Sequence, residues 1–133
     1  MKGILKVRNF DSVKKLSLKR ALGKQKSLHH RMGAIRTTIL CLDTHGMLDT
    51  DKLWDLLKIY LNYSIESAKL QFVIYYRRGH LHWTKDFSES SMQNYYRNVN
   101  VSSHSMVSNI PYEISAKYRN AIYKKQKENE TNN

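Results

Sequence analysis

The spacing of apolar residues between Asp51 and Tyr63 constrains the fold of this chain more than any other feature. Leucine and tyrosine side chains recur there at three- and four-residue intervals, which place them on one face of an α-helix: Leu53, Leu56, Leu57, Tyr60 and Leu61. Asp49 or Thr50 can cap the start of this helix. We therefore predict an amphipathic helix over residues 51–63 that packs against the rest of a domain.

Positive charge is concentrated at the N-terminus. The first 33 residues contain ten Lys or Arg and one acid, Asp11, and the whole chain has 23 Lys and Arg against 11 Asp and Glu. A stretch of this kind repels itself in isolation and is typical of proteins that bind a polyanion, because released counterions drive the association. We interpret residues 1–27 as a basic arm, residues 28–123 as a single folded domain, and residues 124–133, which lack apolar side chains, as a disordered tail.

Several classes of protein are disfavoured by the composition. No run approaches the roughly 20 apolar residues that span a bilayer, and the N-terminus has no apolar segment of the secretory type. The single cysteine, Cys41, can form no internal disulfide and has no partner cysteine for a zinc site. No glycine-rich phosphate loop is present. We expect a cytoplasmic or otherwise intracellular protein with no cofactor and no membrane contact.

The segment 67–78 (SAKLQFVIYYRR) decides the fold class, and two interpretations of it remain open. If it is helical, one side presents a row of apolar and aromatic residues and the helix ends at Gly79. The order of elements is then helix 28–44, helix 51–61, a turn, helix 64–78, and two strands at 80–84 and 95–101.

That order of elements resembles winged helix-turn-helix DNA-binding domains over residues 28–101, including the apolar Leu81 two positions after Gly79. The resemblance implies an α+β fold in which the helix 64–78 lies near the DNA groove and the two strands form the wing. This small winged-helix-like domain with a basic N-terminal arm is the fold that we predict.

The alternative interpretation makes the same segment a strand. Its β-branched and aromatic residues favour a β-hairpin over residues 70–84 that turns at Arg78-Gly79. One face of this hairpin would be apolar and would form a core surface: Leu70, Phe72, Ile74, Tyr76, Leu81 and Trp83. With residues 35–42 as a further strand, the fold would be a strand-helix-strand-strand unit.

One short motif could indicate catalysis. The triplet His80-Leu81-His82 on a strand would project two imidazoles to one side, where they could hold a divalent cation. It resembles the metal-binding motif of the single-strand nicking nucleases called HUH enzymes. That resemblance implies a tyrosine nucleophile, for which Tyr118 is the first candidate and Tyr95 or Tyr96 the second, with Gln71 as a third ligand. The simpler interpretation, which we prefer, is that both histidines contact phosphate or solvent.

We therefore predict a small DNA-binding regulator or accessory factor without catalysis. A nicking nuclease and an RNA- or ribosome-binding protein are the alternatives, and DNA is favoured over RNA. The N-terminal residues expected to contact the nucleic-acid backbone are Lys14, Lys15, Lys19, Arg20, Lys24, Lys26 and Arg31. Those expected near the groove are Ser67, Lys69, Gln71, Arg77 and Arg78, and those expected on the wing are His80, His82 and Lys85. An apolar stripe within residues 112–123 could pair two subunits or pack on its own domain.

Overall fold

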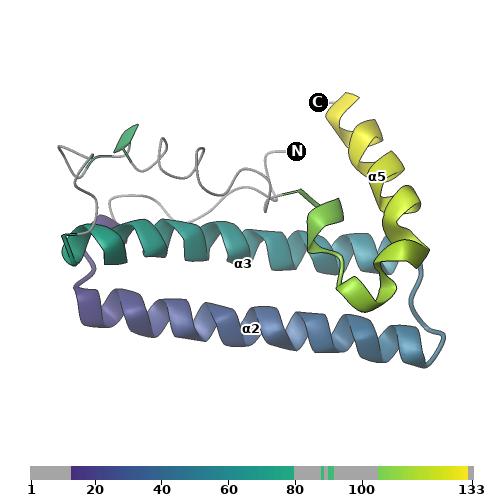
Figure 1. Cartoon of the computed structure of the whole chain (residues 1–133), viewed down its shortest axis with the longest axis horizontal. Coiled ribbons are helices and arrows are strands. Elements are labelled where there is room, and N and C mark those ends of the chain that lie inside the picture. Colours follow the sequence, from purple (N-terminus) through teal and green to yellow (C-terminus); the bar gives the residue numbers. More distant parts are fainter. Residues whose placement is uncertain (1–12, 80–87, 89, 92–104, 132–133) are drawn as a thin grey trace.

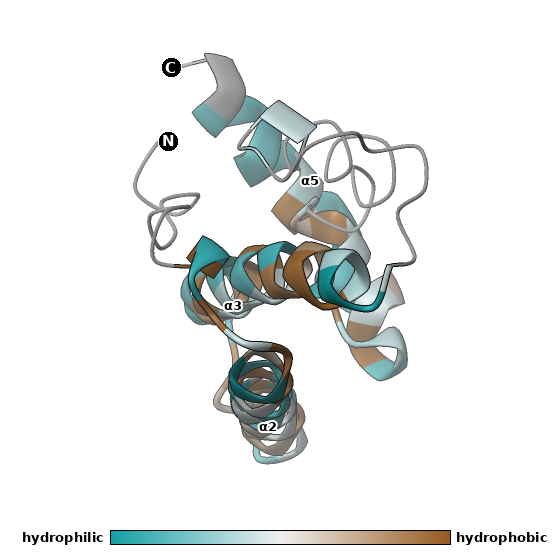
Figure 2. Cartoon of the chain, turned by 90° about the vertical axis from the view of Figure 1, so that its left-hand side faces the viewer, coloured by the Kyte–Doolittle hydropathy of each residue, from teal (hydrophilic) through white to brown (hydrophobic). Residues whose placement is uncertain are grey.

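The computed structural model describes residues 13–79, 88, 90–91 and 105–131. In chain order its elements are the helix α2 (Leu18–Thr44), the helix α3 (Thr50–Arg77), two 3-10 turns, η3 (Val107–Asn109) and η4 (Tyr112–Ile114), and the helix α5 (Ser115–Thr131). The helices α2 and α3 lie side by side as a long antiparallel hairpin, and α5 rises from the end at which they are joined (Figure 1). Viewed end-on, α3 lies between α2 and α5 (Figure 2).

The predicted α+β winged-helix fold is wrong, because the described residues contain helices and no strand. The alternative strand-helix-strand-strand unit is also wrong. Residues 35–42 lie within α2 and residues 70–77 within α3. The strands predicted at 80–84 and 95–101 lie outside the described residues. The β-branched and aromatic composition of 67–78 was therefore a poor guide, because burial against neighbouring elements overrides local β-propensity.

The helix predicted over residues 51–63 is confirmed as the first half of α3. The side chain of Asp49 caps it by accepting a 2.8 Å hydrogen bond from the backbone N–H of Lys52. The turn predicted between the helices 51–61 and 64–78 is absent, since no glycine or proline interrupts the chain there and α3 continues to Arg77. Gly79, with a φ of 72°, follows the helix in the left-handed conformation that glycine adopts without strain.

The helix α2 begins within the segment that the charge pattern assigned to an arm. Ser17 caps it by accepting a 3.2 Å hydrogen bond from the backbone N–H of Arg20. One side of α2 faces α3 through side chains at helical spacing, of which Ala21, Leu28 and Ile39 are buried and Met32, Ile35 and Leu42 are half-buried. The predicted boundary between residues 27 and 28 thus falls inside a continuous helix, because apolar contacts and not net charge decide where the helix starts.

The apolar core consists of two clusters. One cluster lies near the N-terminal end of α2 and contains Val13, Leu16, Ala21, Leu28, Leu70, Val73 and Ile74. Near the turn and α5, the other cluster contains Ile39, Leu53, Trp54, Leu57, Leu61, Ile65, Ile114 and Ile122 among others. Polar contacts also join α2 to α3: the Gln25 amide donates a 2.8 Å hydrogen bond to the Gln71 side chain, and the His29 ring bonds the Ser67 hydroxyl at 2.9 Å. These hydrogen bonds satisfy polar groups that would otherwise be costly to place in the interface.

The helix α5 closes one end of the hairpin. Of the apolar stripe predicted within residues 112–123, Ile114 of η4 and Tyr118 and Ile122 of α5 are buried in this chain's own core. Beyond them α5 continues to Thr131, through most of the segment predicted as a tail. Within residues 13–79 and 105–131, none of the helices combines the length and the apolar content that crossing a bilayer requires.

Candidate nucleic-acid interface

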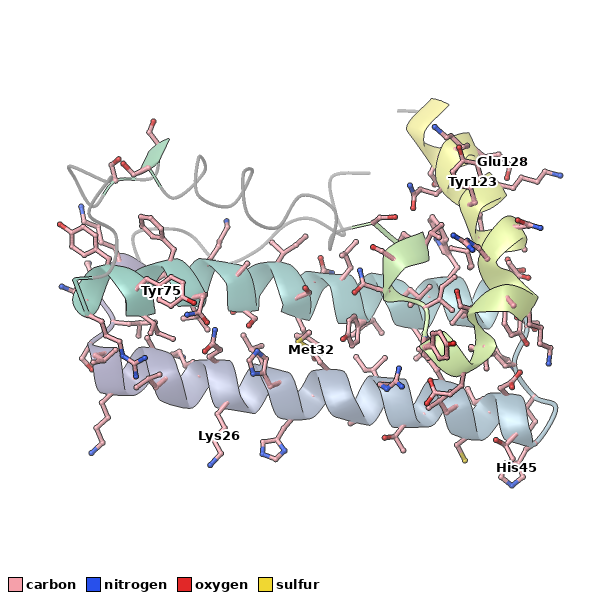
Figure 3. All side chains as sticks on the ribbon, in the orientation of Figure 1. Lys26, Met32, His45, Tyr75, Tyr123 and Glu128 are labelled. Atoms are coloured by element: carbon pink, nitrogen blue, oxygen red, sulfur yellow. The ribbon has the colours of Figure 1, made fainter. Side chains whose placement is uncertain are left out.

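Five of the predicted backbone-contacting cations lie together on the N-terminal half of α2. All five are exposed, and we call this set the basic face: Lys19, Arg20, Lys24, Lys26 and Arg31. Figure 3 shows Lys26 pointing away from α3 and Met32 pointing toward it. The basic face therefore occupies the side of α2 that the hairpin contact leaves uncovered.

More cations lie at the same end of the hairpin. Lys14 and Lys15 precede α2 and are exposed, and Arg78 is exposed at the C-terminal end of α3. The Arg77 guanidinium donates hydrogen bonds to the Lys14 carbonyl at 2.8 Å and to the Leu16 carbonyl at 3.3 Å. These bonds attach the segment before α2 to the end of α3, so that Lys14 and Arg77, 63 residues apart in sequence, share one end of the molecule.

Most carboxylates of the described residues lie at the other end of the hairpin. There the pairs Lys117–Asp43 (2.9 Å), Lys125–Asp51 (3.0 Å) and Arg36–Glu113 (2.8 Å) join α5 and η4 to the hairpin. Within the described part of the chain, no carboxylate pairs with a side chain of the basic face, although Arg31 lies over the Tyr63 ring at 5.9 Å. In the described residues, charges are thus paired at one end of the hairpin, whereas the five cations of the basic face at the other end have no carboxylate partner.

This distribution is unfavourable for the folded chain alone. The first turn of α2 contains no acid, so Lys19 and Arg20 sit at the positive end of the helix dipole. Arg20 and Lys24 are like charges four residues apart, an arrangement that costs a few tenths of a kcal/mol in a helix, about 0.2–0.5. A bound polyanion would remove both penalties, which makes the basic face a candidate interface.

Three of the five residues predicted near a DNA groove, Ser67, Lys69 and Gln71, are not exposed. Ser67 is buried and Gln71 half-buried, and both are hydrogen-bonded to α2. Lys69 is half-buried on α3. The wing residues His80, His82 and Lys85, like Tyr95 and Tyr96, lie outside the described residues. Among all the residues predicted to contact nucleic acid, the N-terminal cations, Arg77 and Arg78 are the ones that lie together, at one end of the hairpin.

Sequence reasoning missed the small and polar residues that lie among the cations. Gly23, Ser27 and His30 are exposed on α2 between members of the basic face. Their four- and three-residue spacing puts them on one line along the helix. The signal was present in the sequence, but it becomes readable only once residues 18–31 are known to be helical.

The predicted nucleophile Tyr118 has the surroundings of a structural side chain. It is 7% exposed, and its hydroxyl lies 3.1 Å from the Leu48 carbonyl and 3.3 Å from the Asp43 carboxylate, both acceptors. Burial raises the pKa of this phenol above its usual 10.0, and the nearby Asp43 raises it further. An activated nucleophile needs the opposite shift or a base to take its proton. The described residues also contain no group of three potential metal ligands.

Replacement of Tyr118 by phenylalanine should alter the pH dependence of stability. The raised folded-state pKa means that the stabilisation from the neutral hydroxyl is complete below about pH 10 and is lost as pH rises through that pKa. We expect Tyr118→Phe to cost about 1 kcal/mol at neutral pH and to lose stability less steeply than the wild type above pH 10. Urea unfolding followed by circular dichroism, repeated from pH 7 to above pH 10, measures the free energy of unfolding of both proteins. If that free energy fell equally with pH in the two proteins, the structural role of the Tyr118 hydroxyl would be contradicted.

Comparisons of this chain with protein-family models, with curated protein sequences and with solved structures give no match. The class that the described residues define is a long helical hairpin with a third helix packed at its joined end. Functional inference therefore depends on the charges and geometry of the chain itself.

Proposed function

We propose that this protein binds nucleic acid through the basic face of α2. The observation that supports the proposal is the set of five exposed cations on one side of a helix with no carboxylate paired to them in the described residues. Lys14, Lys15 and Arg78 extend the same positive surface around the end of the hairpin. Binding alone is proposed, without a reaction.

The arrangement of the cations favours a linear polyanion as the partner. From Lys19 to Arg31 the basic face extends about 18 Å along the helix axis, at 1.5 Å per residue. A nucleic-acid duplex presents a phosphate about every 1.7 Å of its axis, so a rigid row of cations can neutralise several phosphates at once and release their counterions. A membrane surface would be expected to bind a helix with large apolar side chains beside the cations. Near the basic face, Leu22 is such a residue, and it is only 36% exposed.

The salt dependence of binding tests the proposal. If each of the five cations neutralises one phosphate, the logarithm of the association constant should fall with the logarithm of salt concentration with a slope of about −4.5. Contacts from Lys14, Lys15 and Arg78 would make the slope steeper. Fluorescence anisotropy of the full chain with labelled 20-base-pair duplexes, duplex RNA and single strands over a salt series measures it. Absence of salt-sensitive binding to every nucleic acid, or tighter binding to phosphatidylserine vesicles than to any of them, would refute the proposal.

A further inference from the structure

The cations of the basic face form two rows along α2. Lys19 and Lys26 are seven residues apart, nearly two full helical turns, and therefore lie in one row. Arg20, Lys24 and Arg31 are separated by four and seven residues and lie in a second row. At about 100° per residue the second row is displaced by more than a quarter of a turn from the first. The exposed side of the helix thus has a positive flank on each edge.

Residues with side chains shorter than those of lysine and arginine lie between the two rows. Gly23, Ser27, His30 and Ala34 follow one another at spacings of four, three and four residues, and all of them are exposed. A Cβ atom added at Gly23 would meet no atom within 4 Å, so the fold itself does not require glycine there. In an exposed helix interior, glycine is about 1 kcal/mol less favourable than alanine. Between the two rows of long cationic side chains, the surface of α2 therefore protrudes less, and Ser27 and His30 provide polar groups there.

We infer that α2 lies in the major groove of B-form duplex DNA, with its two rows of cations on the phosphates of opposite strands. This inference rests on the proposed function and adds to it the class of nucleic acid and the mode of contact. A helix with its side chains is about 10–12 Å across, and the major groove of B-DNA is about 12 Å wide. The walls of that groove are the two phosphate backbones, which matches a helix that is positive on both edges.

The geometry also disfavours duplex RNA. The major groove of A-form RNA is too deep and narrow for side chains to read, and its minor groove is wide and shallow. In B-DNA, Ser27 and His30 would face base edges, where a hydroxyl and an imidazole can donate or accept hydrogen bonds, and Gly23 would allow close approach of the helix backbone.

A set of duplexes with equal charge tests the inference. The full chain is titrated at one salt concentration against a 20-base-pair DNA, the same sequence as duplex RNA, and the same DNA containing glucosylated 5-hydroxymethylcytosine, whose sugars fill the major groove. We expect the unmodified DNA to bind about tenfold or more tightly than either of the others, since both remove groove contacts and leave the phosphates in place. Equal affinity for the glucosylated DNA, or for duplex RNA, would overturn the groove inference.

The proposed function and the groove placement predict different outcomes in this titration. If all three duplexes bind with the same affinity and a steep salt dependence, the proposed function stands and the groove placement falls. If none of them binds, the proposed function falls as well.

A matched pair of glycine substitutions gives an independent test. Gly23→Leu places a bulky side chain between the two rows of cations, and we expect it to reduce affinity for unmodified DNA about tenfold. Gly33→Leu is the control: it lies on the same helix, it also has nothing within 4 Å of an added Cβ, and it lies beyond Arg31 and off the line of short residues. Leucine favours helix over glycine, so both variants should retain the helix content measured by circular dichroism. Equal affinities for the two folded variants would contradict the groove placement.

Discussion

Replacing Arg20 and Lys24 together by glutamate is expected to weaken nucleic-acid binding about 100-fold at 0.1 M salt and to make the salt slope shallower by about 2. Each lost phosphate contact is worth nearly one order of magnitude at that salt concentration, and the new carboxylates add repulsion. Fluorescence anisotropy over a salt series measures both quantities.

The same double substitution should stabilise the folded protein. Arg20 is the third residue after the N-cap Ser17, so Arg20→Glu completes a capping box at the start of α2. It also replaces a cation by an anion at the positive end of the helix dipole, an exchange worth about 0.3–1 kcal/mol or more. A rise in the unfolding midpoint together with a loss of binding would separate the interface from the fold. A loss of both would indicate instead that the substitution damages α2.

The control for charge alone is the pair Lys52→Glu and Lys124→Glu. Both lysines are exposed and lie on α3 and α5, away from the basic face, and their replacement changes the net charge by the same amount. We expect this variant to bind nearly as well as the wild type, because distant exposed charges are largely screened at this ionic strength. A comparable loss of affinity in the control would mean that net charge, and not the basic face of α2, drives binding.

Truncation of Leu57 to alanine is expected to lower the free energy of unfolding by about 3 kcal/mol. The Leu57 side chain is fully buried on α3, in the cluster where α2, α3 and α5 meet. Its removal costs both the transfer free energy of the lost methyl groups and the cavity that remains. Urea unfolding followed by circular dichroism at 222 nm measures the change, and a shift in the midpoint without a change in the denaturant slope would show an effect on stability alone.

Ile59→Ala is the matched control on the same helix. Ile59 lies two residues away and is 45% exposed, so its truncation leaves no internal cavity and introduces a better helix former. We expect a change within about 0.5 kcal/mol. If both variants lost the same stability, the division of α3 into a buried and an exposed face would be incorrect.

The sequence predicted the fold correctly where apolar spacing, capping residues and helix propensity all indicate the same element. In residues 51–63, leucine spacing, capping and helix propensity all favour one helix, and α3 begins with it. In residues 67–78 the β-branched and aromatic side chains indicated a strand, while their spacing was also compatible with a helix. Val73 and Ile74 are buried in the cluster formed with α2, a contact between segments far apart in sequence that no local rule contains.

The candidate site was predictable in composition and not in placement. The cations of the first 33 residues were evident from the sequence, but they were assigned to an arm, and their neighbours Gly23, Ser27 and His30 carried no meaning without a helix. The predicted groove residues Ser67 and Gln71 proved to bond α2, because polar side chains on a helix can satisfy one another across an interface as well as face a ligand.

Two properties of this protein follow from the amino-acid sequence alone. The N-terminal quarter is strongly basic, and residues 51–63 form a helix that must bury one face. Charge and periodicity are local quantities, and they can be counted along the chain. Only the tertiary structure decided that residues 67–77 continue that helix, and that α2 turns its apolar residues toward α3 and its cations outward. Those outcomes depend on which distant side chains exclude water from one another, and that pairing is a property of the folded chain as a whole.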